Sequence, residues 1–140
     1  MNYSRTYKLL IVEDNPVDAG VLKKVISKNF HYAYKLKIVN SLGKAISEMT
    51  YRKESYDMIL LDLNLSDSRG ICTLQSFREY CDNIPIIVVS SISDNKVIRQ
   101  ALINGASSYV VKGKDKPKEI INEVHHVLDN NKFLTRQNLL

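Results

Sequence analysis

Short, continuous apolar runs alternate along the chain with longer segments in which apolar residues recur at helical spacing. A run of about four to eight Leu, Ile and Val residues is typical of a strand buried on both faces. The second run instead alternates polar and apolar residues, which indicates a strand nearer the edge of a sheet. The pattern predicts strands at residues 7–12, 35–39, 57–62, 84–89 and 108–111.

The segments between these runs predict helices. Asn15 followed by Pro16 is a strong start signal, because Asn caps a helix and Pro suits its first position. Ser41 is expected to cap the second helix, and residues 104–105 (Asn-Gly) end the fourth. The predicted helices are 16–29, 42–49, 71–80, 94–104 and 117–128.

The apolar positions of each helix predict the side that packs on the sheet. For the first, fourth and last helices these positions are Val17, Val21, Leu22, Val25 and Ile26; Val97, Ile98, Ala101 and Leu102; and Ile120, Ile121, Val124 and Val127.

Alternating strands and helices with short loops imply an α/β fold, because parallel strands need crossover connections. We expect a five-stranded parallel sheet, doubly wound with helices on both faces, in a flavodoxin-like three-layer sandwich. The length of 140 residues fits one domain. We place it at residues 7–129, after an N-terminal extension (1–6) and before a tail or the start of a linker (130–140).

The composition, with 44% apolar and 25% charged residues, is ordinary for a soluble globular protein. No apolar stretch approaches the roughly 18 residues of a membrane span. The polar start lacks a signal sequence, so a cytoplasmic location is expected. Cys72 and Cys81 are nine positions apart and are not expected to form a disulfide.

A net charge of +5 raises the question of nucleic-acid binding. The densest basic stretch contains Lys112, Lys114, Lys116 and Lys118, without interleaved aromatic residues or a known nucleic-acid motif. We therefore interpret it as a solvated loop. His31, His125 and His126 lack the spacing of metal ligands and are interpreted as ordinary residues.

Polar residues follow the predicted buried strands. Glu13 and Asp14 end the first, Asp62 the third, Ser90 and Ser91 the fourth, and Lys112 the fifth, as the chain order shows. The C-terminal ends of parallel strands lie at one edge of the sheet, where α/β folds build their sites. Gathered carboxylates repel each other unless a cation or a proton joins them.

These residue types suit phosphoryl chemistry. Carboxylates are the oxygen ligands that Mg²⁺ prefers, and an ionised Asp can attack phosphorus to give an acyl phosphate. An ammonium and a metal ion neutralise the charge of the transferring group. A hydroxyl can donate a hydrogen bond to it.

With these motifs the chain resembles the receiver domain of two-component response regulators, the CheY-like superfamily, over almost its whole length. The resemblance rests on four motifs that occur in order at strand ends. They are residues 11–15 (IVEDN), 59–65 (ILLDLNL), 85–90 (PIIVVS) and 104–112 (NGASSYVVK).

The resemblance implies that Asp62 accepts a phosphoryl group from a phosphohistidine of a histidine kinase or a histidine phosphotransfer protein. It implies Mg²⁺ binding by Asp14, by Glu13 largely through water, by Asp62 and by the backbone carbonyl of Asn64. Lys112 would pair with Asp62 before phosphorylation and with the phosphoryl group afterwards.

The same resemblance makes Ser90 the switch hydroxyl and Tyr109 the switch aromatic. It also implies a signalling switch rather than an enzyme, acting on a downstream domain or target protein, with a homodimer formed on phosphorylation. The given sequence shows no DNA-binding or catalytic domain after residue 129. We therefore expect either that the protein acts through protein contacts or that the sequence is the N-terminal piece of a longer chain.

Three positions depart from the common receiver pattern. Ser66 and Gly113 stand where Pro is usual, and Ser91 stands beside the phosphoryl pocket where Ala is common. Gly permits unusual backbone angles, so the loop after Lys112 can still form, but it holds Lys112 less rigidly. We expect Ser91 and Asn64 to alter the lifetime of the phosphate, because they border the path of attacking water.

Two other functions were weighed. A small Mg²⁺-dependent phosphatase with Asp62 as nucleophile would usually carry a second acid two residues later, where this chain has Asn64. A flavodoxin-like cofactor binder needs a phosphate-binding loop after the first strand. Glu13 and Asp14 at that place would repel a phosphate.

Overall fold

The computed structural model describes residues 5–51, 55–114 and 116–139, and the side chains up to residue 130. Its strands form one parallel sheet in the order β2-β1-β3-β4-β5. This is the predicted doubly wound arrangement, because the chain winds outward from β1 in both directions. The strands are β1 (Tyr7–Val12), β2 (Tyr34–Val39), β3 (Met58–Leu61), β4 (Ile86–Ser90) and β5 (Ser108–Val111).

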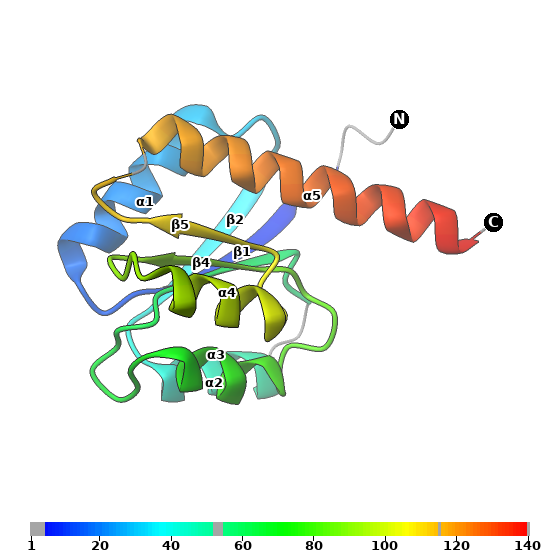
Figure 1. Ribbon diagram of the computed structural model, residues 1–140. Coiled ribbons are helices and arrows are strands. Elements are labelled where there is room, and N and C mark those ends of the chain that lie inside the picture. The colour runs from blue at the N-terminus through cyan, green and yellow to red at the C-terminus, as the bar shows by residue number, and fades with distance from the viewer. Residues whose placement is uncertain (1–4, 52–54, 115, 140) are drawn as a thin grey trace.

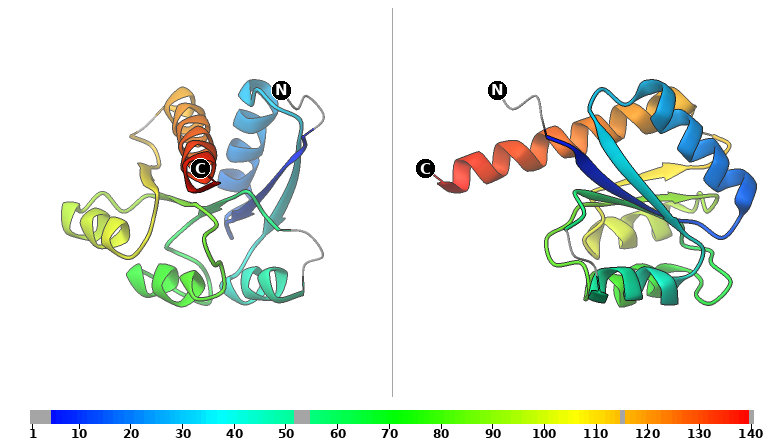
Figure 2. Two further views of the ribbon diagram at one scale, coloured as in Figure 1. Left: turned by 90° about the vertical axis from the view of Figure 1, so that its right-hand side faces the viewer. Right: turned by 180° about the vertical axis from the view of Figure 1, so that it is seen from behind.

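Helices cover both faces of the sheet, which confirms the three-layer sandwich. In Figures 1 and 2 the first and last helices lie on one face and the other three on the opposite face. The helices are α1 (Pro16–Asn29), α2 (Leu42–Tyr51), α3 (Ile71–Arg78), α4 (Asn95–Ile103) and α5 (Pro117–Leu139).

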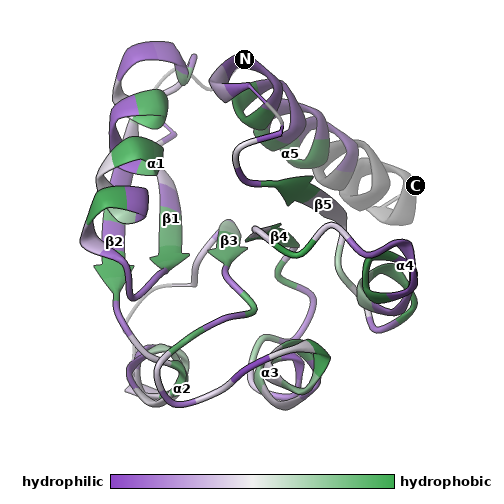
Figure 3. Cartoon of the chain, turned by 60° about the vertical axis from the view of Figure 1, so that its left-hand side comes forward, coloured by the Kyte–Doolittle hydropathy of each residue, from purple (hydrophilic) through white to green (hydrophobic). Residues whose placement is uncertain are grey.

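The central strands supply side chains to two apolar cores. In β1, Leu10 and Val12 belong to the core under α2, α3 and α4, whereas Leu9 and Ile11 belong to the core under α1 and α5. This alternation follows from the two-residue period of a strand. Figure 3 shows apolar residues along the strands and on the helix sides that face them. The strands β1, β3 and β4 are therefore buried on both faces, as their continuous apolar runs predict, whereas β2 has exposed positions, as expected nearer an edge.

Helix starts agree with the predicted capping residues. The side chain of Asn15 accepts hydrogen bonds from the backbone N–H groups of Val17 and Asp18, and Asp94 accepts from Lys96. Ser41 accepts from Lys44 at the start of α2. These bonds satisfy N–H groups that have no partner within the helix.

The prediction that Val17, Val21 and Leu102 pack on the sheet was wrong. Val17 and Val21 are 73% and 47% exposed, and Leu102 is 47% exposed. The buried stripe of α1 runs through Ala19, Leu22 and Ile26, and Val17 and Val21 lie on the other side of the helix. The apolar positions of the helix span a wider arc than the side that packs on the sheet.

Element boundaries differ by up to two residues from the prediction at β2, β3, β4, α4 and the ends of α2 and α3. Cys81 lies beyond α3, where it is buried, and Cys72 is exposed. Both thiols are free. Within the described ranges, no helix has the combination of length and apolarity that a bilayer crossing requires.

The largest difference concerns α5. It was expected to end near residue 128, but its backbone continues without a break to Leu139. Of the alternatives for residues 130–140, a continued helix is the one found, and residue 140 lies outside the described part. Figure 1 shows this end of α5 projecting away from the sheet and the other helices. At the other terminus, Arg5 pairs with Asp57 at 2.8 Å, and residues 1–4 are not described.

Candidate functional site

The ladder of the sheet extends one residue past three strands and fixes the polar residues there. The backbone N–H of Glu13 donates to Val39, that of Asp62 donates to Val12, and that of Lys112 donates to Ser90, at 2.8–3.0 Å. These residues therefore meet at the C-terminal edge of the sheet, as predicted.

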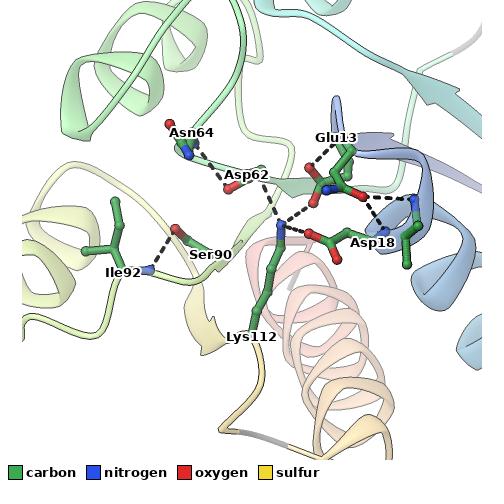
Figure 4. Close-up of polar contacts among 9 residues, drawn as sticks. Glu13, Asp18, Asp62, Asn64, Ser90, Ile92 and Lys112 are labelled. Carbon is green, nitrogen blue, oxygen red and sulfur yellow. Dashed lines mark hydrogen bonds and ion pairs between the residues drawn. The ribbon is translucent and has the colours of Figure 1, made fainter.

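Lys112 connects the acidic residues. Its Nζ donates to Oδ2 of Asp62 at 3.1 Å, to Oδ2 of Asp18 at 3.0 Å and to Oε1 of Glu13. Figure 4 shows the ammonium pointing into this group from β5, opposite α1. The pairing of Lys112 with Asp62 is the one that the resemblance implied.

Sequence reasoning missed Asp18. It lies in the first turn of α1. An acidic residue is common there, because its negative charge interacts favourably with the positive end of the helix dipole. The available signal was its place three residues after the Asn15 cap, at the start of the helix that follows the acidic end of β1. That signal does not identify Lys112 as its partner.

Burial and charge oppose each other within the group. Burial raises the pKa of Glu13 to about 7. The hydrogen bond from Lys112 lowers this pKa, and the neighbouring Asp62 raises it further. Burial lowers the pKa of Lys112, but the hydrogen bonds to Glu13 and Asp18 outweigh it and hold the pKa above its usual range. Lys112 is therefore charged, and the carboxylates around it still exceed it in number.

Glu13, Asp14 and Asp62 offer carboxylate oxygens that all lie within 4.8 Å of one another. Asp14 is partly exposed, and the other two are buried. Such a cluster of hard oxygen ligands with excess negative charge fits a divalent cation, and one open side suits Mg²⁺, which keeps several waters. The residues present therefore agree with the expected metal.

A cleft of about 540 Å³ opens over the cluster. Besides the carboxylates and Lys112, its lining includes Asn64, Arg69 and Ser91. The backbone N–H of Asn64 donates to Oδ1 of Asp62 at 3.2 Å. Ser91 is exposed, so both residues predicted to border the path of water reach the cleft. Arg69 was not among the predicted site residues.

The predicted switch pair lies beside the cleft. Ser90 is completely buried at the end of β4, and its Oγ accepts the backbone N–H of Ile92 at 3.2 Å. The hydroxyl of Tyr109 donates to the carbonyl of Ile92 at 2.7 Å. Burial raises the pKa of this hydroxyl. Both side chains therefore hold the same loop residue, between β4 and α4.

The family profile "Response regulator receiver domain" matches residues 9–125. The chain belongs to this family. Receiver domains of this kind are parts of two-component systems. The match covers β1 from residue 9 onward, the other four strands and each acidic residue of the site.

Curated relatives of the receiver domain are regulators. The glycerol metabolism activator of Pseudomonas putida is 29% identical over 128 residues, which are 91% of this chain and 57% of that protein. The transcriptional regulatory protein KdpE of Staphylococcus aureus is 34% identical over 105 residues, or 75% of this chain and 43% of that protein. The chain thus spans about half the length of these relatives.

Solved structures agree with the fold. The CheY-like receiver domain protein of Methanospirillum hungatei has a TM-score of 0.77 at 20% identity, covering 91% of this chain and 98% of that one. The phosphorylated cyanobacterial phytochrome response regulator RcpA has a TM-score of 0.72 at 22% identity, covering 88% and 91%. At these identities the likeness concerns the fold.

Gly113 follows Lys112 in the receiver domain with a φ of +78°, which Gly adopts without strain. The described residues contain no cis peptide bond. The loop after Lys112 is therefore built with an all-trans backbone around Gly113. Ser66, the other departure from the usual Pro, is exposed.

Proposed function

We propose that this receiver domain is a phosphorylation switch in which Asp62 takes a phosphoryl group from the phosphohistidine of a histidine kinase or a histidine phosphotransfer protein. One observation carries the proposal. The ammonium of Lys112 contacts Asp62 at 3.1 Å on the floor of an open, acidic cleft. A carboxylate nucleophile that borders a cleft, beside a fixed positive charge, is what phosphoryl transfer requires.

In the reaction, a carboxylate oxygen of Asp62 forms a bond to phosphorus while the phosphorus–nitrogen bond of the donor histidine breaks. The product is an acyl phosphate, and the donor imidazole leaves with the electron pair. Asp62 needs no general base, because its carboxylate carries the attacking electrons. Lys112 exchanges its bond to Asp62 for one to a phosphoryl oxygen.

Mg²⁺, when bound, would neutralise negative charge on the phosphoryl oxygens. Asp14, Glu13 and Asp62 would hold it, with the backbone carbonyl of Asn64 as a further ligand. Since Glu13 already contacts Lys112, its part in binding the ion is best met through a water molecule. The cluster would hold the ion with the acceptor Asp62 among its ligands.

Ser90 and Tyr109 would report the phosphoryl group to the surface. Both contact Ile92, so a hydroxyl that turns toward the phosphate releases one of its restraints. A phosphorylated protein would then favour a second packing of α4 and β5. A downstream domain, a target protein or a second copy of the chain would recognise that packing in the cytoplasm.

The test uses acetyl phosphate as donor with Mg²⁺, followed by intact mass spectrometry. We expect the protein to gain one phosphate and Asp62→Asn to gain none. Omitting Mg²⁺ should also remove the gain. If neither acetyl phosphate nor a cognate kinase phosphorylates the parent protein, the proposal is wrong.

The alternative of a phosphatase is less well supported. The residue two positions after Asp62 is Asn64, whose side chain cannot act as an acid at neutral pH. The relatives are transcriptional regulators. A switch with slow self-dephosphorylation explains the same residues, and a screen with phosphate monoesters would separate the two functions.

A further inference from the structure

We propose that Asp18 is a positioning residue, which holds the ammonium of Lys112 in place from α1 while its contact to Asp62 is exchanged. The effect on phosphoryl transfer rests on the proposed function. The contact itself does not, and it can be tested separately.

The first observation is the number of partners of Lys112. A lysine ammonium has three N–H donors, and Lys112 donates to three carboxylates, those of Glu13, Asp18 and Asp62. The donors are therefore fully used. A phosphoryl oxygen can be bound only if one of these bonds is given up.

Only one of the three carboxylates has no other task in the proposed reaction. Asp62 becomes an acyl phosphate, and Glu13 serves the metal cluster. Asp18 does not belong to that cluster, yet it lines the same cleft. It is thus the acceptor that can keep its bond to Lys112 before, during and after transfer.

The second observation is that the start of α1 is more restrained than the loop that follows Lys112. Asp18 belongs to the first turn of α1, which the Asn15 cap and Pro16 fix. Lys112 precedes Gly113, and no Pro stiffens that loop. The bond at 3.0 Å therefore ties the less restrained side chain to the more restrained helix.

The solvent exposure of Asp18 limits how strongly it can affect the phosphorylation rate. The side chain of Asp18 is 40% exposed and that of Lys112 is 18% exposed. An ion pair with one exposed member contributes modestly, because water screens it. We therefore expect Asp18 to change rates by about fivefold, rather than to abolish transfer.

A competing explanation is that Asp18 only stabilises α1 through the helix dipole. That role would alter thermal stability without altering Lys112. Asp18→Asn removes the charge at nearly constant shape, and Asp18→Glu restores the charge on a longer arm. Glu79→Gln at the exposed end of α3 is a control for the same loss of charge elsewhere.

The deciding measurement is hydrogen exchange of the Lys112 ammonium, followed by NMR in ¹⁵N-labelled protein without Mg²⁺. We expect exchange about fivefold faster in Asp18→Asn, and close to the parent rate in Asp18→Glu and Glu79→Gln. An unchanged exchange rate in Asp18→Asn would overturn the proposal. Thermal unfolding identifies any variant that fails to fold, and Asp18→Glu then decides.

The second measurement is the phosphorylation rate with acetyl phosphate and Mg²⁺ at saturating donor. We expect Asp18→Asn to react about fivefold more slowly than the parent and Asp18→Glu to recover most of the rate. A parent-like rate in Asp18→Asn would overturn the positioning role. If the parent itself is not phosphorylated, the proposed function fails, while the exchange rates still decide the contact.

Discussion

Nζ of Lys112 lies 3.1 Å from Oδ2 of Asp62, although 50 positions separate the two residues in the chain. If Lys112 neutralises charge on the transferring group, Lys112→Met should slow phosphorylation of Asp62 by acetyl phosphate about 100-fold. Intact mass over time measures the rate. Lys114→Gln, on the same loop and exposed, should react at the parent rate. Equal rates for both variants would contradict the role of Lys112.

Asp14 is the cluster carboxylate nearest to solvent, and no shared hydrogen bond to Lys112 competes for it within the described contacts. Asp14→Asn should weaken Mg²⁺ binding by about 10- to 100-fold, since an amide is a poorer ligand than a carboxylate. Isothermal titration calorimetry measures the affinity. Glu79→Gln provides the matched control at a remote site, and a drop of similar size there would exclude a specific effect.

Ser91 lines the cleft, where a hydroxyl can hold a water molecule near the acyl phosphate. Replacing it by the smaller, apolar Ala should change the decay rate of phosphorylated Asp62 severalfold. Decay is followed by intact mass after the donor is removed. Asn64→Ala should also change the decay rate, because Asn64 lines the same cleft. Decay of Ser91→Ala at the parent rate would refute the prediction.

His125 couples stability to pH on the far side of the domain. It accepts the backbone N–H of His31 through Nε2 at 3.1 Å and stacks on Phe30. Burial lowers its pKa below 6.5, His31 adds to this, and Asp129 opposes it. Below that pH the unfolded chain binds a proton more readily than the folded one.

The contribution of His125 should therefore be complete above pH 6.5 and be lost as the pH falls toward the lowered pKa of the folded protein. Urea unfolding at a series of pH values measures it. His125→Phe keeps the stacking and should flatten this part of the pH dependence. His126→Gln, at the exposed neighbouring position, should retain it. Parallel curves for the parent and His125→Phe would contradict this.

Asp67 caps α2 from the loop that follows β3. Its carboxylate oxygens accept the backbone N–H groups of Leu42 and Gly43, each at 2.9 Å, and these bonds lower its pKa. Asp67→Ala should reduce the free energy of unfolding by about 1 kcal/mol. Asp67→Asn, which keeps one acceptor oxygen, should cost less. If Asp67→Ala has the same free energy of unfolding as the parent, Ser41 alone is a sufficient cap of α2.

Much of the fold could be predicted because the decisive signals are local. A buried strand such as residues 7–12 carries its apolar run itself, and a cap such as Asn15 stands next to the helix that it starts. The parallel topology then brings Glu13, Asp62 and Lys112 to one edge without further information. Val17 was misplaced because α1 has more apolar positions than its buried side can hold, and the sequence does not say which of them face the sheet.

Long-range side-chain contacts could not be predicted in the same way. Asp18 meets Lys112 across 94 positions and Asp67 meets Leu42 across 25. The local sequence accounts for each acidic residue without a distant partner: Asp18 as a residue of a helix start and Asp67 as a residue of a loop. Which partner it contacts depends on the packing of loops, and no periodic pattern records that packing.

The length of α5 has a mechanical consequence. The helix begins at Pro117, five positions after Lys112, and its 23 residues form a rod of about 35 Å. A tilt of about 10° at its base would move its far end by about 6 Å, as simple geometry on that length gives. If a rearrangement around Lys112 tilted the base of α5 by that angle, the far end of the rod would move by slightly more than the pitch of one helical turn.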